Sequence, residues 1–442
     1  MLTSDNDLDA RAEVAATKTQ NCIWRSRMRI LIVVALLLRL VAAVAVDDYA
    51  TNAGRQFLIE GDANGYWALA EKICAGDDYA IHTPPRYVLR VPGFPLLLSV
   101  SICVFGNNIL AARIVLAIIG TACCWLTFRL GTEASSERAG FWAAAFVAIN
   151  PVHVGNSVLI LSETYFAFWM LMSLLALFRL LQQLRGSSAD QTFKLRRALF
   201  KAACVGATIG VTVMVRPGFL PWLGVAVLAA LAIERTRTLT APFAVRILAS
   251  GVMVIGCILV MLPWAVRNFE ATGHLVFTSL WSGPSMYDGL NPNADGASNM
   301  QFFDDDNVMA TMSEFEMNEH YKRKAIDFAT ANPGRTVMLA LNKTARCLSP
   351  VPNFAKSSGW VVWVVCVVLW LALFGGVYLG IKKHPRDSAV LLVTVGPLLL
   401  FLLVHMVFVG SVRYRLPLEF PLSVLGAIGW CRLSLSRETS ES

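Results

Sequence analysis

Residues 25–46 read RSRMRILIVVALLLRLVAAVAV, three arginines followed by a long apolar run. The run from residue 30 to residue 46 is close to the length that an α-helix needs to cross the hydrocarbon core of a bilayer. Positive charge is normally retained on the cytoplasmic side of a membrane, so Arg25, Arg27 and Arg29 place the N-terminus inside. This stretch therefore predicts a first membrane-spanning helix and the orientation of the helices that follow it.

The composition extends this prediction to the whole chain. Of 442 residues, 56% are hydrophobic and 15% are charged, and the mean hydropathy is +0.57. Soluble proteins carry roughly 25% charged residues. The sequence therefore predicts an all-α integral membrane protein with about ten transmembrane helices. The expected crossings are residues 30–46, 109–129, 140–156, 163–184, 198–215, 217–233, 246–265, 359–381, 388–410 and 416–431.

Loop charges divide the chain into regions. The short basic loops fall inside, as does most of the net charge of +8, and no nucleic-acid motif is present. The first outer loop contains a helix-like stretch and an 11-residue apolar run, residues 95–105. That run is too short to cross, so we expect it in the interface or re-entrant. The predicted regions are a disordered cytoplasmic tail (1–28), a transmembrane module (29–265) with outer loop 47–108, an outer-face insert (266–357), C-terminal transmembrane helices (358–432) and a cytoplasmic tail (433–442).

Several arginines do not follow the rule that positive charge stays inside. They map to the outer face, at or near helix ends and beside the carboxylates of Asp62 and Glu163. The planar guanidinium group suits phosphate because it offers two parallel hydrogen bonds. The set therefore predicts a site that holds an anion. Its arginines are Arg86, Arg90, Arg216, Arg267, Arg413 and Arg415.

Each candidate also has a structural interpretation. Asp62 precedes an amphipathic stretch and could cap a helix, or act as a general base toward an acceptor hydroxyl. Glu163 could complement the charge of a helix N-terminus, or bind a metal, a sugar hydroxyl or an arginine. Arg86 and Arg90 could extend toward lipid headgroups, or line the mouth of a site for a phosphorylated lipid.

Other polar residues have no catalytic assignment. We expect Arg39, in the middle of the first span, to form an interhelical pair, and His405 to be a neutral, hydrogen-bonded core residue. Cys74 and Cys347 could face an oxidising exterior and pair with each other. The acidic run 304–306 lacks the spacing of a calcium loop, which favours a solvated loop. A helix is expected over 316–330, ended by the Asn-Pro-Gly at 332–334.

The order of short motifs resembles a known family. The motifs are DANGY at 62–66, RVPGFP at 90–95, LSET at 161–164, VRP at 215–217, LPWAVRN at 262–268, GLNP at 289–292, NPGR at 332–335 and RYRLP at 413–417. Together, over residues 30–432, they resemble the bacterial polyprenyl-phosphate-dependent glycosyltransferases of the GT-C fold. These enzymes are relatives of the dolichyl-phosphate-mannose–protein mannosyltransferases (family 39) and of the lipid A aminoarabinose transferases.

The resemblance implies a GT-C-like bundle that takes a sugar from a polyprenyl phosphate and passes it to a lipid, glycan or protein acceptor. It assigns the catalytic carboxylate to Asp62 and makes Arg216, Arg267 and Arg413 holders of the donor phosphate. Tyr66 belongs to the same motif as Asp62 and is expected to bind substrate. Family members often have Asp followed directly by Glu where this chain has Asp62-Ala63, and this departure weakens the case for a metal-binding site. The resemblance leaves open whether a divalent metal takes part.

The implied location is the cytoplasmic membrane, with both termini inside and the active site on the outer face. Two other functions remain open. A secondary transporter would place its ionisable groups near the bilayer midplane, often in repeated halves, and no repeat is evident in the sequence. A lipid-linked glycan polymerase or ligase would share the many spans and the outer-face arginines.

Overall fold

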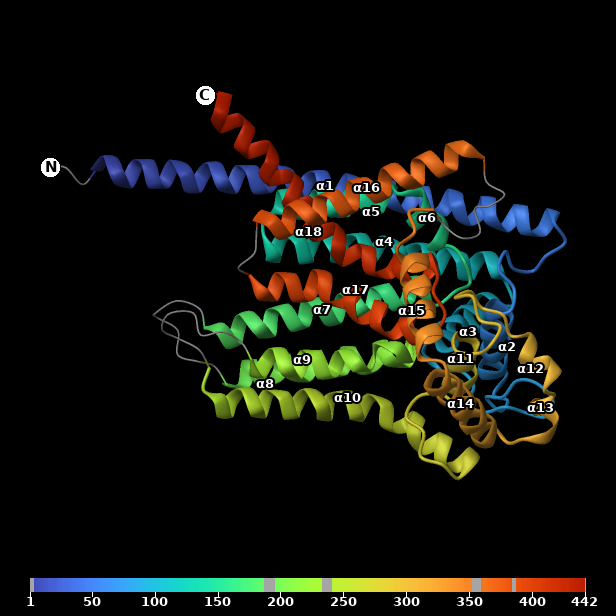
Figure 1. The fold of residues 1–442 in the computed structure, drawn as a ribbon. Coiled ribbons are helices and arrows are strands. Elements are labelled where there is room, and N and C mark those ends of the chain that lie inside the picture. The colour runs from blue at the N-terminus through green and yellow to red at the C-terminus, as the bar shows by residue number, and fades with distance from the viewer. Residues whose placement is uncertain (1–3, 187–194, 233–240, 352–358, 384–386, 442) are drawn as a thin grey trace.

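The computed structural model describes residues 4–186, 195–232, 241–351, 359–383 and 387–441, and within them it contains helices and no β-strand (Figure 1). The elements are α1 (Ser4–Asn52), α2 (Asp62–Ala75), α3 (Gly93–Phe105), α4 (Ile109–Ala134), α5 (Glu137–Ile149), α6 (Pro151–Asn156), α7 (Glu163–Arg185), α8 (Leu195–Val215), the 3-10 helix η1 (Pro217–Phe219), α9 (Pro221–Leu231), α10 (Phe243–Thr272), α11 (Ser282–Gly289), α12 (Gln301–Asp305), α13 (Val308–Thr311), α14 (Glu314–Ala331), α15 (Pro333–Leu348), α16 (Trp360–Lys383), α17 (Ser388–Val407) and α18 (Val412–Glu441). The predicted all-α membrane fold is confirmed.

Seven described helices are long and apolar enough to cross a membrane: α1, α4, α7, α8, α10, α16 and α17. The other three expected crossings correspond to helices α5, α9 and α18. Helix α5 has only 13 residues because Asn150-Pro151 breaks the predicted span and begins α6. Helix α9 has 11 residues because η1 precedes it. Helix α18 begins with charged residues, and all three helices lie among the long ones in the bundle (Figure 1).

The two terminal helices are longer than expected. Helix α1 starts at Ser4, within the stretch predicted to be a disordered tail, and α18 continues to Glu441. No glycine or proline occurs before Gly54, so nothing in the sequence interrupts α1 between its polar and apolar parts. The predicted boundary at residue 28 is therefore a change in composition and not a change in backbone structure.

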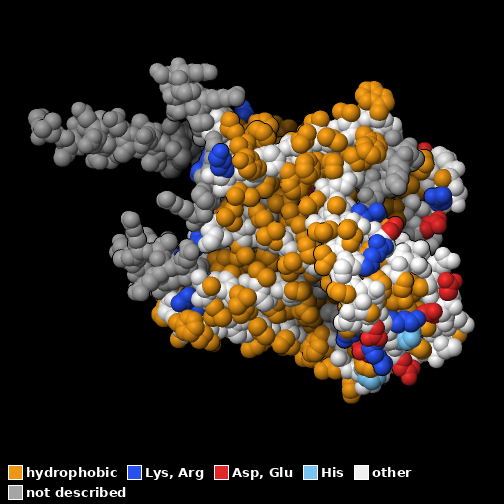
Figure 2. Space-filling model, viewed as in Figure 1, with side chains coloured by type: hydrophobic (Ala, Val, Ile, Leu, Met, Phe, Trp, Pro, Cys, Tyr) orange, Lys and Arg blue, Asp and Glu red, His pale blue; other side chains and the backbone are white. Residues whose placement is uncertain are grey.

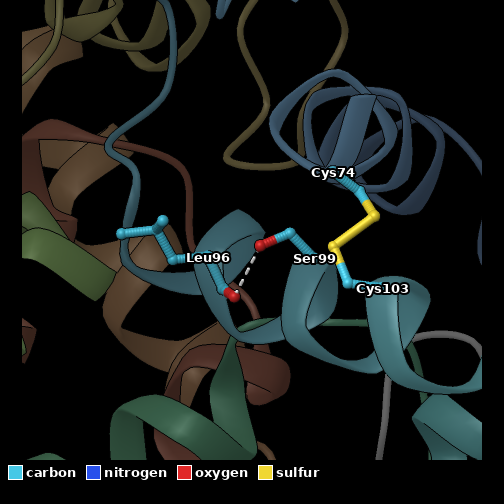
Figure 3. Close-up of a disulfide and its surroundings, with 4 residues drawn as sticks. All are labelled: Cys74, Leu96, Ser99 and Cys103. Atoms are coloured by element: carbon cyan, nitrogen blue, oxygen red, sulfur yellow. Dashed lines mark hydrogen bonds between the residues drawn. A yellow bond between two sulfur atoms is a disulfide. The ribbon is translucent and has the colours of Figure 1, made fainter. Parts of the chain in front are cut away.

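The first outer loop folds against one end of the bundle. Helices α2 and α3 lie side by side there, joined by a disulfide between Cys74 and Cys103 (Figure 3). With 13 residues, α3 is about 20 Å long, too short to cross a core of about 30 Å. The suggested pairing of Cys74 with Cys347 was wrong, because Cys347 is a buried free thiol on α15.

The insert after α10 covers the same end of the bundle with short helices, α11 to α15 (Figure 1). The expected helix over 316–330 is α14, which starts at a capping box between Ser313 and Glu316 and is followed at once by α15. A small core of Leu89, Val308, Met317 and Tyr321 attaches the insert to the first outer loop. The acidic side chains and several basic ones gather at this end, further Lys and Arg side chains lie near the opposite end, and apolar side chains cover the bundle between them (Figure 2).

Two intramembrane residues have the kinds of partners expected of them. Arg39 is fully buried and donates to the carbonyl oxygens of Val147 (3.1 Å) and Ala148 (3.2 Å), near the C-terminus of α5. These carbonyls belong to the last turn of α5, whose oxygens have no partner within their own helix. His405 forms a 2.9 Å hydrogen bond through Nδ1 with the carbonyl oxygen of Val409. Both residues therefore satisfy backbone groups where the helices would otherwise leave them unpaired.

Candidate active site

Five helix ends and loops converge where α2 and α3 meet the bundle. Asp62 is the first residue of α2, and Glu163 is the first residue of α7. Arg216 follows α8 directly, and Arg413 lies in the first turn of α18. Arg90 comes from the loop before α3. The positions are far apart in the sequence, so only the packing of the bundle brings these side chains together.

Their charged groups form one continuous network. Arg90 Nη2 donates to Asp62 Oδ1 at 3.1 Å, and Arg413 Nη2 lies 3.0 Å from Asp62 Oδ2. Arg413 also donates through Nε to Glu163 Oε1, which accepts from Arg216 Nη2 at 2.7 Å. Arg413 therefore bridges the two carboxylates, while Arg90 binds Asp62 and Arg216 shares Oε1 of Glu163 with Arg413.

The network contains three guanidinium groups and two carboxylates, so it carries one unmatched positive charge. The side chains of Arg90, Arg413 and Arg216 are 25%, 21% and 16% exposed, whereas that of Glu163 is fully buried. An arriving anion can therefore reach the arginines while Glu163 holds two of them from beneath. Such an arrangement suits a singly charged anion such as a phosphodiester, because charge-assisted hydrogen bonds from guanidinium to phosphate are strong.

Asp62 titrates at lower pH than an ordinary aspartate. Burial raises the pKa of Asp62, but the positive charges of Arg90 and Arg413 and their hydrogen bonds outweigh it, so the pKa lies below its usual value of 3.8. The carboxylate is ionised at neutral pH and both of its oxygens are engaged.

Aromatic rings hold the arginines in place. The guanidinium of Arg90 lies 4.5 Å from the centre of the Tyr66 ring, and that of Arg216 lies 5.3 Å from the Tyr414 ring. These contacts attract a cation to the face of the ring. Tyr414 is itself stacked on His405, with ring centres 4.4 Å apart.

A glycine allows the loop that carries Arg90 to lie close to α8. A Cβ atom on Gly93 would lie 2.5 Å from the carbonyl oxygen of Met214, closer than real Cβ contacts. The RVPGFP motif therefore requires glycine at this position. Because Met214 is two residues before Arg216, this close approach also brings the segment of Arg90 beside the segment of Arg216.

The helix-capping alternatives are only partly realised. Gly61 is the N-cap of α2 and Ser162 is the N-cap of α7, and neither cap makes a side-chain hydrogen bond to its helix. Asp62 and Glu163 are the first helical residues, where the helix dipole favours a negative charge. Their carboxylates bond to the arginines described above, so they stabilise the network as well as the helix ends.

Three of the predicted site residues lie outside this network. Arg86 is buried and donates to the carbonyl oxygens of Met309 and Met312 in the insert. Arg86 therefore connects the first outer loop to the insert and does not extend to lipid headgroups.

Arg267 and Arg415 also bind backbone. Arg267 donates to the carbonyl oxygens of Tyr87 (2.6 Å) and Tyr79 (2.8 Å), which fixes the loop before Arg90. Arg415 is buried and donates to Glu419, to Cys347 O and to Ser349 O. The expected convergence of Arg267 with the carboxylates is therefore absent, because its donors are used by the loop. We assign to both arginines the positioning of neighbouring segments.

The two carboxylates of the network are paired with arginines and are not grouped with further acidic, His or Cys side chains among the described residues. Asp62 and Glu163 are both engaged by guanidinium groups, and the described residues contain no group of three or more His, Cys, Asp or Glu side chains that could hold an ion. Divalent cations prefer several oxygen ligands. The acidic run expected to be a solvated loop also forms no such group: Asp306 pairs with Lys324 at 2.7 Å and accepts from Tyr321 at 3.2 Å.

Two contributors to the site were not predicted from the sequence. Ser162 Oγ accepts from Arg216 Nε at 3.1 Å, and Tyr414 lies beside Arg216. Ser162 and Tyr414 are direct neighbours of Glu163 and Arg413 in the LSET and RYRLP motifs. Their places next to Glu163 and Arg413 in the sequence are the signal from which they could have been predicted.

Comparison with solved structures identifies the architecture. The oligosaccharyltransferase AglB from Archaeoglobus fulgidus, in complex with an inhibitory peptide and a dolichol-phosphate, superposes with a TM-score of 0.54 at 15% identity over 94% of this chain and 52% of that chain. The apo form of the Archaeoglobus fulgidus oligosaccharyltransferase gives 0.53 at 15% identity over 92% and 52%. The chain has the GT-C fold.

The GT-C bundle spans about half the length of these oligosaccharyltransferases. ArnT from Cupriavidus metallidurans bound to undecaprenyl phosphate is also similar, with a TM-score of 0.42 at 14% identity over 92% of this chain and 78% of that chain. No protein-family model matches the sequence, and no curated protein matches it either.

Proposed function

We propose that this protein is a membrane glycosyltransferase that moves a sugar from a polyprenyl-phosphate donor to an acceptor on the outer face of the cytoplasmic membrane. The observation that carries the proposal is the network of Arg90, Asp62, Arg413, Glu163 and Arg216 at one end of a GT-C bundle. It supplies unmatched positive charge for a phosphate and a carboxylate for an acceptor in one place.

The donor would be held by its phosphate. A polyprenyl-phosphate sugar is a phosphodiester with a single negative charge, which equals in size the unmatched charge of the network. Arg413, Arg216 and Arg90 are the groups that would contact it. As the bond between the sugar C1 and the phosphate oxygen breaks, a second negative charge develops on the leaving polyprenyl phosphate. Guanidinium groups already in place stabilise that charge without reorganisation.

The acceptor would be activated by Asp62. Both oxygens of Asp62 are paired with arginines, which lower its pKa, so the carboxylate is a weak base. A donor phosphate competes for Arg413, and when Arg413 turns toward the phosphate one oxygen of Asp62 is released. The acceptor hydroxyl then attacks C1, its proton passes to Asp62, and the new C–O bond replaces the bond to phosphate.

The geometry favours a transferase over a transporter. A transporter places its ionisable groups near the bilayer midplane, whereas these five residues lie at helix ends beside short helices too short to cross. A lipid-linked oligosaccharide ligase stays the second candidate, and the likeness to an oligosaccharyltransferase supports it. The two differ in whether one sugar or a preassembled chain is moved.

The test is a transfer assay on the purified protein in lipid nanodiscs. Donors are undecaprenyl phosphates carrying a labelled single sugar or an oligosaccharide, offered with a membrane extract as acceptor. Label moved from a single-sugar donor supports the proposal, and label moved from the oligosaccharide donor alone supports the ligase. Comparing glycolipids and glycoproteins from cells with and without the protein by mass analysis then names the product. Identical profiles, together with no transfer from either donor, would refute both.

A further inference from the structure

Helix α15 turns an apolar side away from the protein. Val337, Met338 and Leu341 are each more than half exposed, and their spacing puts them on one side of the helix. Lys343, on another side, is fully buried. An amphipathic helix on the surface of a soluble protein has the opposite arrangement, with its apolar side against the core and its charged side in water. The exposed side of α15 is therefore suited to an apolar partner.

The orientation of α15 differs from that of the membrane-spanning helices. It lies crosswise to α7, α8 and α10, at the end of the bundle where the network lies (Figure 1). Its 16 residues make a helix about 24 Å long. A helix in this orientation does not cross a bilayer, but its whole length can lie within one leaflet.

Hydrogen bonds to two spans fix the depth of α15. Lys343 Nζ donates to the carbonyl oxygens of Met406 (3.2 Å) and Val407 (2.8 Å), at the end of the span α17. The indole of Trp370 donates to the carbonyl oxygen of Leu348, the last residue of α15, at 2.9 Å. Trp370 lies ten positions, and therefore about 15 Å, into the span α16. The middle of α15 is thus level with the end of one span, and its C-terminus lies beside the interior of another.

The neighbouring span α16 shows what surrounds α15 at this depth. Val361, Val364 and Val368 lie between the start of α16 and Trp370, and each is more than half exposed. Such side chains on a spanning helix face the acyl chains of the bilayer. The C-terminus of α15 lies no farther from the bilayer centre than they do, so lipid and not water is the medium next to it.

Interfacial amphipathic helices place their apolar side about 5–10 Å into the boundary between headgroups and acyl chains. Helix α15 has the orientation, the depth and the exposed apolar side for this position, and it contains no acidic residue that would have to enter the apolar layer. We propose that α15 is an interfacial helix whose Val337, Met338 and Leu341 lie among the acyl chains of the leaflet on the side of the network. The partner of this surface is the lipid bilayer and not a second copy of the chain or an acceptor protein.

Lipid contact at α15 would hold the first turn of α18 at a fixed depth. Arg415, in that turn, donates to the carbonyl oxygens of Cys347 (2.9 Å) and Ser349 (2.7 Å) at the end of α15. Arg413 of the network lies in the same turn. Helix α15 can lie in the leaflet whether or not the protein transfers a sugar, so the proposal does not depend on the proposed function.

The test is photocrosslinking of the full chain in lipid nanodiscs. Benzoylphenylalanine is placed at Leu341, at Val364 of α16 as the lipid-facing control, and at the exposed Asp305 of α12 as the water-facing control. The yield of phospholipid adducts, measured by mass analysis, should be the same at Leu341 as at Val364 and severalfold lower at Asp305. A yield at Leu341 as low as that at Asp305, or crosslinks from Leu341 to a second copy of the chain or to another protein, would overturn the proposal.

Met338 tests the same surface without a substitution in α15. An oxidant converts an accessible methionine to its sulfoxide, and the anionic oxidant chloramine-T stays in the water phase. Asp305→Met supplies a water-exposed methionine in the same chain. In nanodiscs Met338 should be oxidised severalfold more slowly than the methionine introduced on α12. Equal rates of oxidation would show that Met338 lies in water and would overturn the proposal.

Discussion

Replacing Arg413 by Gln tests how the network works. Arg413 is the only one of the three arginines in the network that contacts both carboxylates, through Nη2 to Asp62 and Nε to Glu163. Glutamine keeps a hydrogen-bonding side chain of similar shape and removes the charge. The substitution takes away the unmatched positive charge, leaving two arginines against two carboxylates.

The expected loss follows from the role proposed for this side chain. Removing one donor that stabilises an oxyanion in a transition state costs about 10²–10³ in rate. We expect a fall of this size in kcat/KM for the polyprenyl-phosphate donor. Arg413→Lys, which keeps the charge but not the planar fork, should lie between Gln and wild type.

The same variant should change the pH dependence. The positive charges of Arg90 and Arg413 hold the pKa of Asp62 below its usual value against the effect of burial. In Arg413→Gln one of these charges is gone and burial remains, so the pKa of Asp62 rises. The acid limb of kcat/KM that reflects protonation of Asp62 should therefore lie at higher pH in Arg413→Gln than in the wild type.

The assay is donor-dependent transfer in nanodiscs between pH 3.5 and 8, with thermal midpoints measured for every variant. Arg55→Gln, an exposed arginine of the first outer loop, is the matched control and should behave like the wild type. Wild-type donor kinetics for Arg413→Gln, or a rate loss with an unmoved acid limb, would refute the reasoning.

Further predictions concern stability, each read as a shift in the unfolding midpoint. Glu163→Gln should lower the free energy of unfolding by about 3 kcal/mol, because it leaves the guanidinium groups of Arg216 and Arg413 without their buried partner. An unchanged midpoint would show that these ion pairs do not stabilise the fold. Lys343 is buried and donates to Met406 O and Val407 O, and burial lowers its pKa to about 8. Since unfolded lysine titrates near 10.5, the free energy of unfolding should rise between pH 8 and 10.5. Lys343→Met should lose this rise, and a rise that persists in the variant would show that another group causes it. Cys74→Ser opens a loop closed over a separation of 29 residues and should cost about 3.5 kcal/mol. Cys123→Ser replaces a free thiol, so its unfolding midpoint should still fall when the disulfide is reduced.

The sequence predicted the membrane architecture well because the bilayer imposes a simple rule. A backbone in lipid must satisfy its own hydrogen bonds, so apolar runs of sufficient length become helices. The rule predicts helix length less well for α5, which ends before Asn150-Pro151, and for α9, which follows η1. In both, local backbone preferences decide where the helix begins or ends. The rule also does not predict the disulfide of Cys103. A cysteine within an apolar run is interpreted as a core residue until the packing of α2 on α3 is known.

The candidate site was predictable as a set of residue types and not as a set of contacts. Charge at the outer helix ends singled out Asp62, Glu163 and the arginines. Which arginine meets a carboxylate depends on how the helices pack, since a guanidinium group can equally donate to backbone carbonyls. Arg267 does so in the loop before Arg90, while Arg413 reaches both carboxylates.

The most direct test separates donor binding from transfer in Asp62→Asn. We measure retention of undecaprenyl phosphate by native mass spectrometry and sugar transfer in a single turnover, on the same preparation. The variant should bind the lipid phosphate at least as tightly as the wild type, because the network gains one net positive charge, and should transfer no sugar. Transfer at the wild-type rate, or loss of lipid-phosphate binding in a folded protein, would contradict the central claim.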